Sequence, residues 1–147
     1  NSKKDKYKKE SESEIFTTLN YISERPAQTF IKIFNVYIRI TPLEEKYKTE
    51  QNLIEGCQSR VWLQADEVDG KIVFKAESDA LIVKGIIALL IKVLSGHTPD
   101  EILNTDLYFI DKIGLKEHLS PTRSNGLLSM VKQIRMYALA FKAKEGK

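Results

Sequence analysis

Residues 59–76 of this 147-residue sequence read SRVWLQADEVDGKIVFKA, two apolar stretches separated by an Asp-Gly dipeptide. Asp-Gly between alternating hydrophobic residues is a strong signal for a tight β-hairpin turn. We therefore predict strands at 59–66 and 71–76, joined through residues 68–70. Alternation leaves one apolar face that needs cover. That face carries Val61, Leu63 and Ala65 from the first strand and Ile72, Phe74 and Ala76 from the second.

A long apolar helix is predicted directly after the hairpin. It runs from Asp79 to about Leu94, with Ser78 as its N-cap and Gly96 as its stop signal. This stretch is apolar nearly all round, so we expect it to form the centre of the core.

Further helices are predicted towards the C-terminus. Residues 98–101, Thr-Pro-Asp-Glu, have the capping hydroxyl, the early proline and the acids typical of a helix start. A short helix is expected at 106–114, and a last one opens at Ser120-Pro121 and runs towards Lys142. The inward stripe of the last helix is Leu127, Val131, Ile134, Ala138 and Phe141. The predicted fold is α+β, a small antiparallel sheet covered on one face by helices.

The composition is ordinary for a globular domain, with 42% hydrophobic and 29% charged residues and a net charge of +3. Five lysines fall within the first nine residues, so the excess charge is local and argues against a nucleic-acid binder with a broad basic face. We predict a disordered tail at 1–14 and one domain at 15–147. No secretory signal or membrane-spanning run is apparent, which together with a lone thiol favours the cytoplasm.

The chain's only cysteine, Cys57, follows Gly56 and precedes two polar residues, which is typical of a loop entering a strand. A loop cysteine is the most plausible nucleophile of this chain. The alternative is a small buried hydrophobic residue.

Residues 53–62, LIEGCQSRVW, resemble the active-site segment of SufE, the sulfur-acceptor protein of iron–sulfur cluster assembly. The resemblance continues in order through SDA at 78–80, IVKG at 82–85, TP at 98–99 and HLSPTRSNG at 118–126. It covers the chain from about Pro42 to the C-terminus.

The segment before Pro42 does not show the family's helical Trp and Tyr motif. Residues 30–40 are rich in β-branched and aromatic residues, a pattern that favours a strand. Two accounts stay open: a divergent segment that still folds as helix, or a misread sequence upstream of Pro42, for example through a frameshift.

The resemblance implies a SufE/IscU-like fold and a carrier function. Such a protein takes persulfide sulfur from a PLP-dependent cysteine desulfurase of the SufS type onto Cys57, stimulates the desulfurase, and delivers sulfur to a cluster scaffold. It is an accessory sulfur-transfer protein with a covalent persulfide, not a stand-alone enzyme, and it needs no cofactor, metal, nucleic acid or membrane. The alternative is a non-catalytic module that regulates a desulfurase or another enzyme.

The matching segments also supply candidate partner-binding or loop-supporting residues. These are Glu55, Gly56, Gln58, Ser59, Asp79, His118 and Arg123. Asp79 also fits a simple helix-start acid, and His118 a surface histidine. Arg123 falls in the first turn of a helix, where the dipole disfavours a cation, so we expect a functional reason such as a partner carboxylate.

The charges beside Cys57 leave its pKa open, because Arg60 would lower the pKa and Glu55 would raise it. Other chemistries find little support. His97 and His118 lack zinc-ligand spacing, and no Gly-x-Gly-x-x-Gly, phosphate-binding Gly-Lys-Ser/Thr or Gly-x-Ser-x-Gly motif occurs. A cluster scaffold with three cysteines is excluded because two of those thiols are missing.

Overall fold

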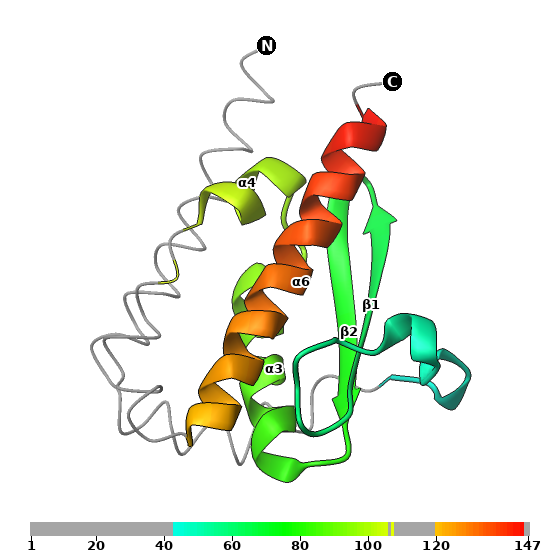
Figure 1. Cartoon of the computed structure of the whole chain (residues 1–147). Coiled ribbons are helices and arrows are strands. Elements are labelled where there is room, and N and C mark those ends of the chain that lie inside the picture. The colour runs from blue at the N-terminus through cyan, green and yellow to red at the C-terminus, as the bar shows by residue number, and fades with distance from the viewer. Residues whose placement is uncertain (1–42, 106, 108–119, 146–147) are drawn as a thin grey trace.

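The hairpin predicted around Asp-Gly is present (Figure 1). Strand β1 (Val61–Val68) pairs antiparallel with β2 (Lys71–Ser78), in a register that sets Val68 opposite Lys71. Asp69 and Gly70 form the turn with φ angles of 54° and 78°, the positive values that a two-residue type I′ turn requires. The predicted bounds differ by two residues, because β1 starts and ends two residues later and β2 ends two residues later.

The structure is a computed structural model that describes residues 43–105, 107 and 120–145. The predicted tail at 1–14, the segment at 30–40 and His118 lie outside the described residues, as does the helix predicted at 106–114 apart from Leu107. Two short 3-10 helices, η2 (Glu45–Tyr47) and η3 (Glu50–Asn52), precede β1.

Helix α3 (Leu81–Leu94) packs against β2 and forms the centre of the core, as predicted. From Val83 onwards only its two lysines are not buried. The predicted N-cap was wrong. Ser78 instead ends β2 and its hydroxyl donates to the Arg60 carbonyl at 2.7 Å, so the helix begins two residues later than expected, after Ala80 and without a side-chain cap.

The chain turns back along β2 after α3. Gly96, at φ 80°, donates its N–H to the Ile72 carbonyl at 2.7 Å, and the Ile72 N–H donates to the His97 carbonyl at 2.8 Å. Helix α4 (Pro99–Asn104) then opens with the predicted cap: Thr98 Oγ1 accepts from the Glu101 N–H at 3.2 Å, and Glu101 Oε1 accepts from the Thr98 N–H at 3.1 Å. Reciprocal bonds of this kind satisfy two otherwise orphaned donors.

Helix α6 (Pro121–Glu145) starts where predicted and runs three residues beyond Lys142. Leu127, Ile134 and Ala138 of its predicted stripe are buried, and Val131 and Phe141 are partly buried.

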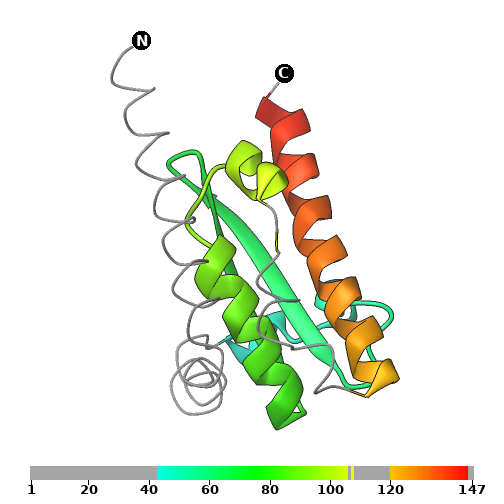
Figure 2. The ribbon, with the colours of Figure 1, turned by 90° about the vertical axis from the view of Figure 1, so that its left-hand side faces the viewer.

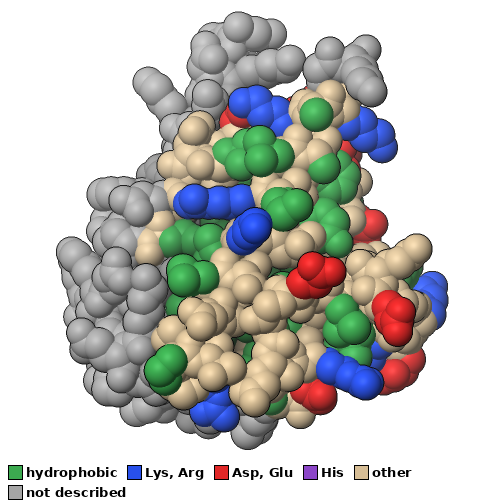
Figure 3. Space-filling view, viewed as in Figure 1, with side chains coloured by type: hydrophobic (Ala, Val, Ile, Leu, Met, Phe, Trp, Pro, Cys, Tyr) green, Lys and Arg blue, Asp and Glu red, His purple; other side chains and the backbone are tan. Residues whose placement is uncertain are grey.

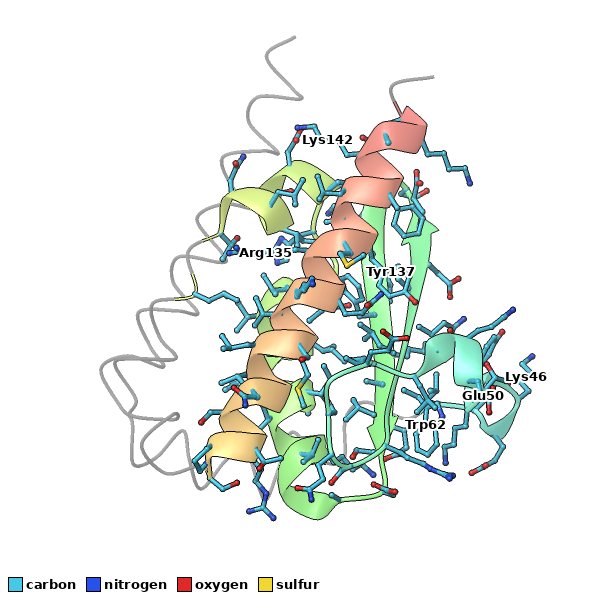
Figure 4. The ribbon with its side chains drawn as sticks, in the orientation of Figure 1. Lys46, Glu50, Trp62, Arg135, Tyr137 and Lys142 are labelled. Atoms are coloured by element: carbon cyan, nitrogen blue, oxygen red, sulfur yellow. The ribbon has the colours of Figure 1, made fainter. Side chains whose placement is uncertain are left out.

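Two side chains of α6 fix its position (Figure 4). Arg135 donates to the Thr105 carbonyl after α4 at 3.0 Å, whereas Tyr137 reaches the other way to the Leu63 carbonyl of β1 at 3.5 Å. The Tyr137 ring also meets the Phe74 ring edge-on, with centroids 6.3 Å apart.

Helices α3 and α6 cover one face of the hairpin (Figures 1 and 2). The alternation predicted for that face is confirmed: Val61, Leu63, Ile72, Phe74 and Ala76 are buried, and Ala65 is partly buried. Burial of the Val, Leu, Ile and Phe side chains among them contributes about 1.5–3 kcal/mol each. The fold class predicted from the sequence, α+β with helices on one face of a small antiparallel sheet, is confirmed.

Candidate functional site

Cys57 lies in the loop 55–60 that joins η3 to β1. The two ends of the loop are adjacent, because the Ile54 N–H donates to the Val61 carbonyl at 2.8 Å and Leu53 pairs with Trp62 as an antiparallel bridge. The loop therefore leaves and rejoins the sheet at one place, and a movement of its tip need not disturb the strands.

The C-terminal end of the loop is held against the end of β2. The Arg60 N–H donates to Asp79 Oδ1 at 3.1 Å, and the Asp79 N–H donates back to the Arg60 carbonyl at 3.3 Å. Ser78 Oγ donates to the same carbonyl at 2.7 Å. Asp79 is thus a structural support of the loop base.

The tip of the loop rests on α6. Gly56 has a φ of 91°, and a Cβ built on it would overlap Ser129 Oγ and lie 3.3 Å from Ser129 Cβ. The Cys57 thiol donates to the Gly126 carbonyl, with 3.6 Å between sulfur and oxygen. These two contacts place the sulfur against the N-terminal half of α6.

A small pocket of about 70 Å³ adjoins the sulfur. A water molecule needs roughly 10–15 Å³ by this measure, so the pocket has room for more than one atom of that size. Its lining combines apolar side chains from the two helices with polar groups at its rim: Val83 and Ile86 of α3, Thr122, Arg123, Gly126 and Met130 of α6, and Cys57, Gln58 and Ser59 of the loop.

Burial raises the pKa of the Cys57 thiol above its ordinary value. The low-dielectric surroundings disfavour the thiolate, which is the reactive form. The physical cause is desolvation, so the opposing effects expected from Arg60 and Glu55 do not set the direction. With the loop in this position, Cys57 is half-buried and has a smaller thiolate fraction than an exposed thiol.

The predicted site residues fall into four groups. Gln58, Ser59 and Arg123 line the pocket with Cys57. Asp79 holds the loop base, and His118 lies outside the described residues.

Glu55 and Gly56 lie on the opposite side of the loop, beside a larger hollow of about 660 Å³. Its remaining lining comes from the segment around η3 and from α6: Glu50, Gln51, Leu53, Ser129, Lys132, Gln133 and Met136. The tip of the cysteine loop therefore separates two depressions of very different size.

Sequence reasoning did not single out the residues on α6 that contact the loop. Gly126 and Ser129 touch the tip, and Thr122, Gly126 and Met130 line the pocket. A signal was present in the four-residue spacing from 122 to 126 to 130, which puts these residues on one helix face. Nothing local in the sequence relates that face to Cys57, 69 residues away.

In the described part of the chain, no group of three or more His, Cys, Asp or Glu residues is placed to hold a metal ion. Within the same residues, no helix combines the length and the apolar character needed to span a bilayer.

Comparison with known proteins decides the family. The family model SufE, the Fe-S metabolism associated domain, matches residues 21–138. The chain belongs to the SufE family. Its role therefore lies in Fe–S metabolism.

Two relatives give the extent of the similarity to SufE-family proteins. The chain is 44% identical over 107 residues to SufE-like protein 1, chloroplastic/mitochondrial, of Arabidopsis thaliana, a match covering 71% of this chain and 29% of the relative. It is 41% identical over 103 residues to an uncharacterized SufE-like protein of Synechocystis, covering 70% of this chain and 65% of the relative. The chain thus spans less than two thirds of the length of both.

The fold also matches a solved one. The solution structure of a hypothetical protein from Thermus thermophilus superposes with a TM-score of 0.72 at 21% identity, covering 88% of this chain and 96% of that chain.

The SufE family match begins at residue 21, whereas the motif resemblance found in the sequence starts only at about Pro42.

Proposed function

We propose that this SufE-family protein is a sulfur acceptor and carrier. Cys57 takes persulfide sulfur from a PLP-dependent cysteine desulfurase of the SufS type and delivers it to a cluster scaffold. The observation that supports this most directly is the position of the chain's one thiol, at the tip of a loop with a fixed base and beside a pocket with space for further atoms.

The chemistry is a transfer of one neutral sulfur atom. The Cys57 thiolate attacks the terminal sulfur of the donor's persulfide, the donor's S–S bond breaks, and the donor cysteine leaves as a thiolate. Cys57 then carries the S–S bond, with no net oxidation. Attack by an acceptor thiolate on the terminal sulfur regenerates Cys57. Removal of the donor's persulfide frees the desulfurase for another turnover, which accounts for stimulation.

A single cysteine suits this carrier. A second thiol close by would attack the inner sulfur of the Cys57 persulfide, form a disulfide and expel the cargo as sulfide. The sequence contains no second cysteine. A free thiol also suits a reducing compartment such as the cytoplasm.

In this proposal the loop has two positions, one with the thiol in the pocket and one with the thiol exposed to a docked donor. In the position described, burial raises the pKa of Cys57 and so lowers its thiolate fraction below that of an exposed thiol. Outward movement of the tip would remove the desolvation, lower the pKa towards its ordinary value and present the thiolate to a docked donor. Return to the pocket would shield the loaded persulfide from solvent reductants.

The other candidate residues take supporting parts in this proposal. Arg123 at the pocket rim is exposed and suits a partner carboxylate, while Asp79 holds the loop base. Gln58 and Ser59 lie beside the thiol and Glu55 lies on the other side of the loop tip, and a docked desulfurase would contact them there. His118 stays a candidate on the sequence alone.

Intact-mass analysis tests the proposal. The protein is incubated with a purified SufS-type desulfurase and cysteine without reductant, and we expect a gain of one sulfur atom's mass that dithiothreitol removes. The Cys57→Ser variant is the matched control and should gain none. No adduct on the wild-type protein, or an equal adduct on Cys57→Ser, would contradict the carrier function.

Desulfurase turnover separates the carrier from the regulatory alternative. Sulfide release is measured with the wild-type protein and with Cys57→Ala. A carrier loses its stimulation with the thiol, whereas full stimulation by Cys57→Ala would identify a non-catalytic regulatory module.

A further inference from the structure

The tip of the cysteine loop touches α6 at Gly56 as well as at the thiol. Gly56 has a φ of 91° and approaches Ser129 so closely that an added Cβ would overlap Ser129 Oγ. The Ser129 hydroxyl is fixed by donating to the Asn125 carbonyl at 3.1 Å. Rotation of that hydroxyl would give up its hydrogen bond and would still leave Ser129 Cβ at 3.3 Å from the added atom.

The base of the loop is fixed by its own set of hydrogen bonds. The bonds from Ile54, Arg60, Ser78 and Asp79 fix where the loop leaves and rejoins the sheet, but none of them involves the tip. At the tip the thiol donates a long bond to the Gly126 carbonyl and packs against the hydrophobic core. The close approach of Gly56 to Ser129 limits how deeply the tip can sit against α6.

We propose that Gly56 is a positioning residue for Cys57: because it has no side chain, its Cα face fits closely against Ser129, and this fit lets the cysteine loop close over its pocket. This deepens the proposed carrier function, on whose sulfur chemistry it rests, but it makes a separate prediction about thiol exposure. A side chain at position 56 would push against Ser129 and shift the loop towards its open position.

Gly56→Ala alone does not isolate this contact, because alanine is also strained at a positive φ. Gly70 provides a matched control, since its φ is 78° and a Cβ on it would meet nothing within 4 Å. Ser129→Ala provides the complementary change, because it removes the atom that the Gly56→Ala methyl would overlap.

The experiment measures the rate at which native Cys57 reacts with a bulky disulfide reagent. We expect Gly56→Ala to react about tenfold faster than the wild type, and Gly70→Ala and Ser129→Ala to stay within about twofold. The double variant Gly56→Ala/Ser129→Ala should return at least half of the way, on a logarithmic scale, to the wild-type rate. The same rescue should appear in the pH profile of the reaction, which moves to lower pH when the loop opens.

Two results would overturn the proposal: a Gly56→Ala rate equal to that of the wild type, or a double variant as fast as Gly56→Ala. If Gly56→Ala does not fold, as judged by its thermal transition, Gly56→Asn takes its place in both backgrounds, because asparagine tolerates positive φ better than alanine. Thiol exposure needs no desulfurase, so failure here is distinguishable from failure of sulfur transfer, which the mass adduct reports.

Discussion

The chemistry of Cys57 depends on where its sulfur lies more than on the charges beside it. The sequence offers an arginine and a glutamate close to the thiol, and their opposing effects left the direction open. Burial decides it, because desolvation raises the pKa of the thiol. A buried thiol is protected from oxidation and alkylation, while an exposed one regains an ordinary thiolate fraction.

Alkylation by iodoacetamide should follow this raised pKa. We expect the pH–rate profile of the native protein to have its midpoint above that of the same thiol in denaturant, where burial is absent. At neutral pH the native thiol should therefore react more slowly than the denatured one. A native midpoint at or below the denatured value would contradict the burial of Cys57.

The same pKa difference links pH to stability. A thiol whose pKa is raised on folding stabilises the fold fully below its unfolded pKa, near 9.0, and that contribution falls as pH rises through the folded pKa. We expect the free energy of unfolding of the wild type to fall above this pH relative to Cys57→Ala. The comparison with Cys57→Ala isolates the thiol, since burial also raises the pKa of Tyr137.

The loop base shows why Asp79 belongs to the structure of the loop. Its carboxylate accepts the Arg60 N–H while its own N–H returns a bond to the Arg60 carbonyl. This pair joins the C-terminal end of the loop to the end of β2, so the loop opening that we propose would be confined to the tip.

Substitution of Asp79 should separate loop support from charge. Asp79→Ala loses the acceptor for Arg60, so we expect a loss of about 1 kcal/mol in unfolding free energy and faster Cys57 labelling. Asp79→Asn keeps a carbonyl oxygen in place and should stay close to the wild type in both. Asp66→Ala, on the exposed end of β1, is the control. Equal effects of Asp79→Asn and Asp79→Ala would show that the negative charge matters more than the bond.

Elements with local signals were predictable from the sequence. The Asp-Gly turn requires positive φ angles that these residues tolerate, and the start of α4 has its cap, proline and acids within four residues. The predicted start of α3 was two residues too early. Ser78 is a residue type that often caps helices, but here its hydroxyl donates to the Arg60 carbonyl instead. The contacts of Cys57 with Gly126 and of Gly56 with Ser129 depend on how α6 packs, which no local pattern encodes.

The pocket is formed jointly by α3, α6 and the cysteine loop, so it depends on how these elements pack together. Figure 1 shows the N-terminal ends of α3 and α6 at the same end of the protein as the loop. Val83 and Ile86 of the one helix and Gly126 and Met130 of the other line the pocket beside the sulfur. The outer face of α6 is different in character: Figure 3 shows hydrophobic and basic side chains along it, and Leu128, Met136 and Leu139 are about half exposed.

This dependence on helix packing leads to a prediction for Met130. Its side chain is 1% exposed, belongs to the hydrophobic core and lines the pocket. Met130→Ala removes a buried side chain between the helices, so we expect a loss of about 2–5 kcal/mol in unfolding free energy. It also removes one wall of the pocket, so Cys57 labelling should accelerate under conditions where the variant is still folded.

Leu139→Ala is the matched control on the same helix, because Leu139 is 56% exposed and the change should stay within about 0.5 kcal/mol. Chemical denaturation gives the free energies, and labelling at denaturant concentrations well below each transition gives the exposure of the thiol. If Met130→Ala lost stability but labelled at the rate of Leu139→Ala, the loop contacts with Gly126 and Ser129 alone would hold the sulfur in place. Faster Cys57 labelling in Met130→Ala than in Leu139→Ala would instead mean that the packing of α3 against α6 protects the thiol. Core stability and protection of Cys57 would then change together.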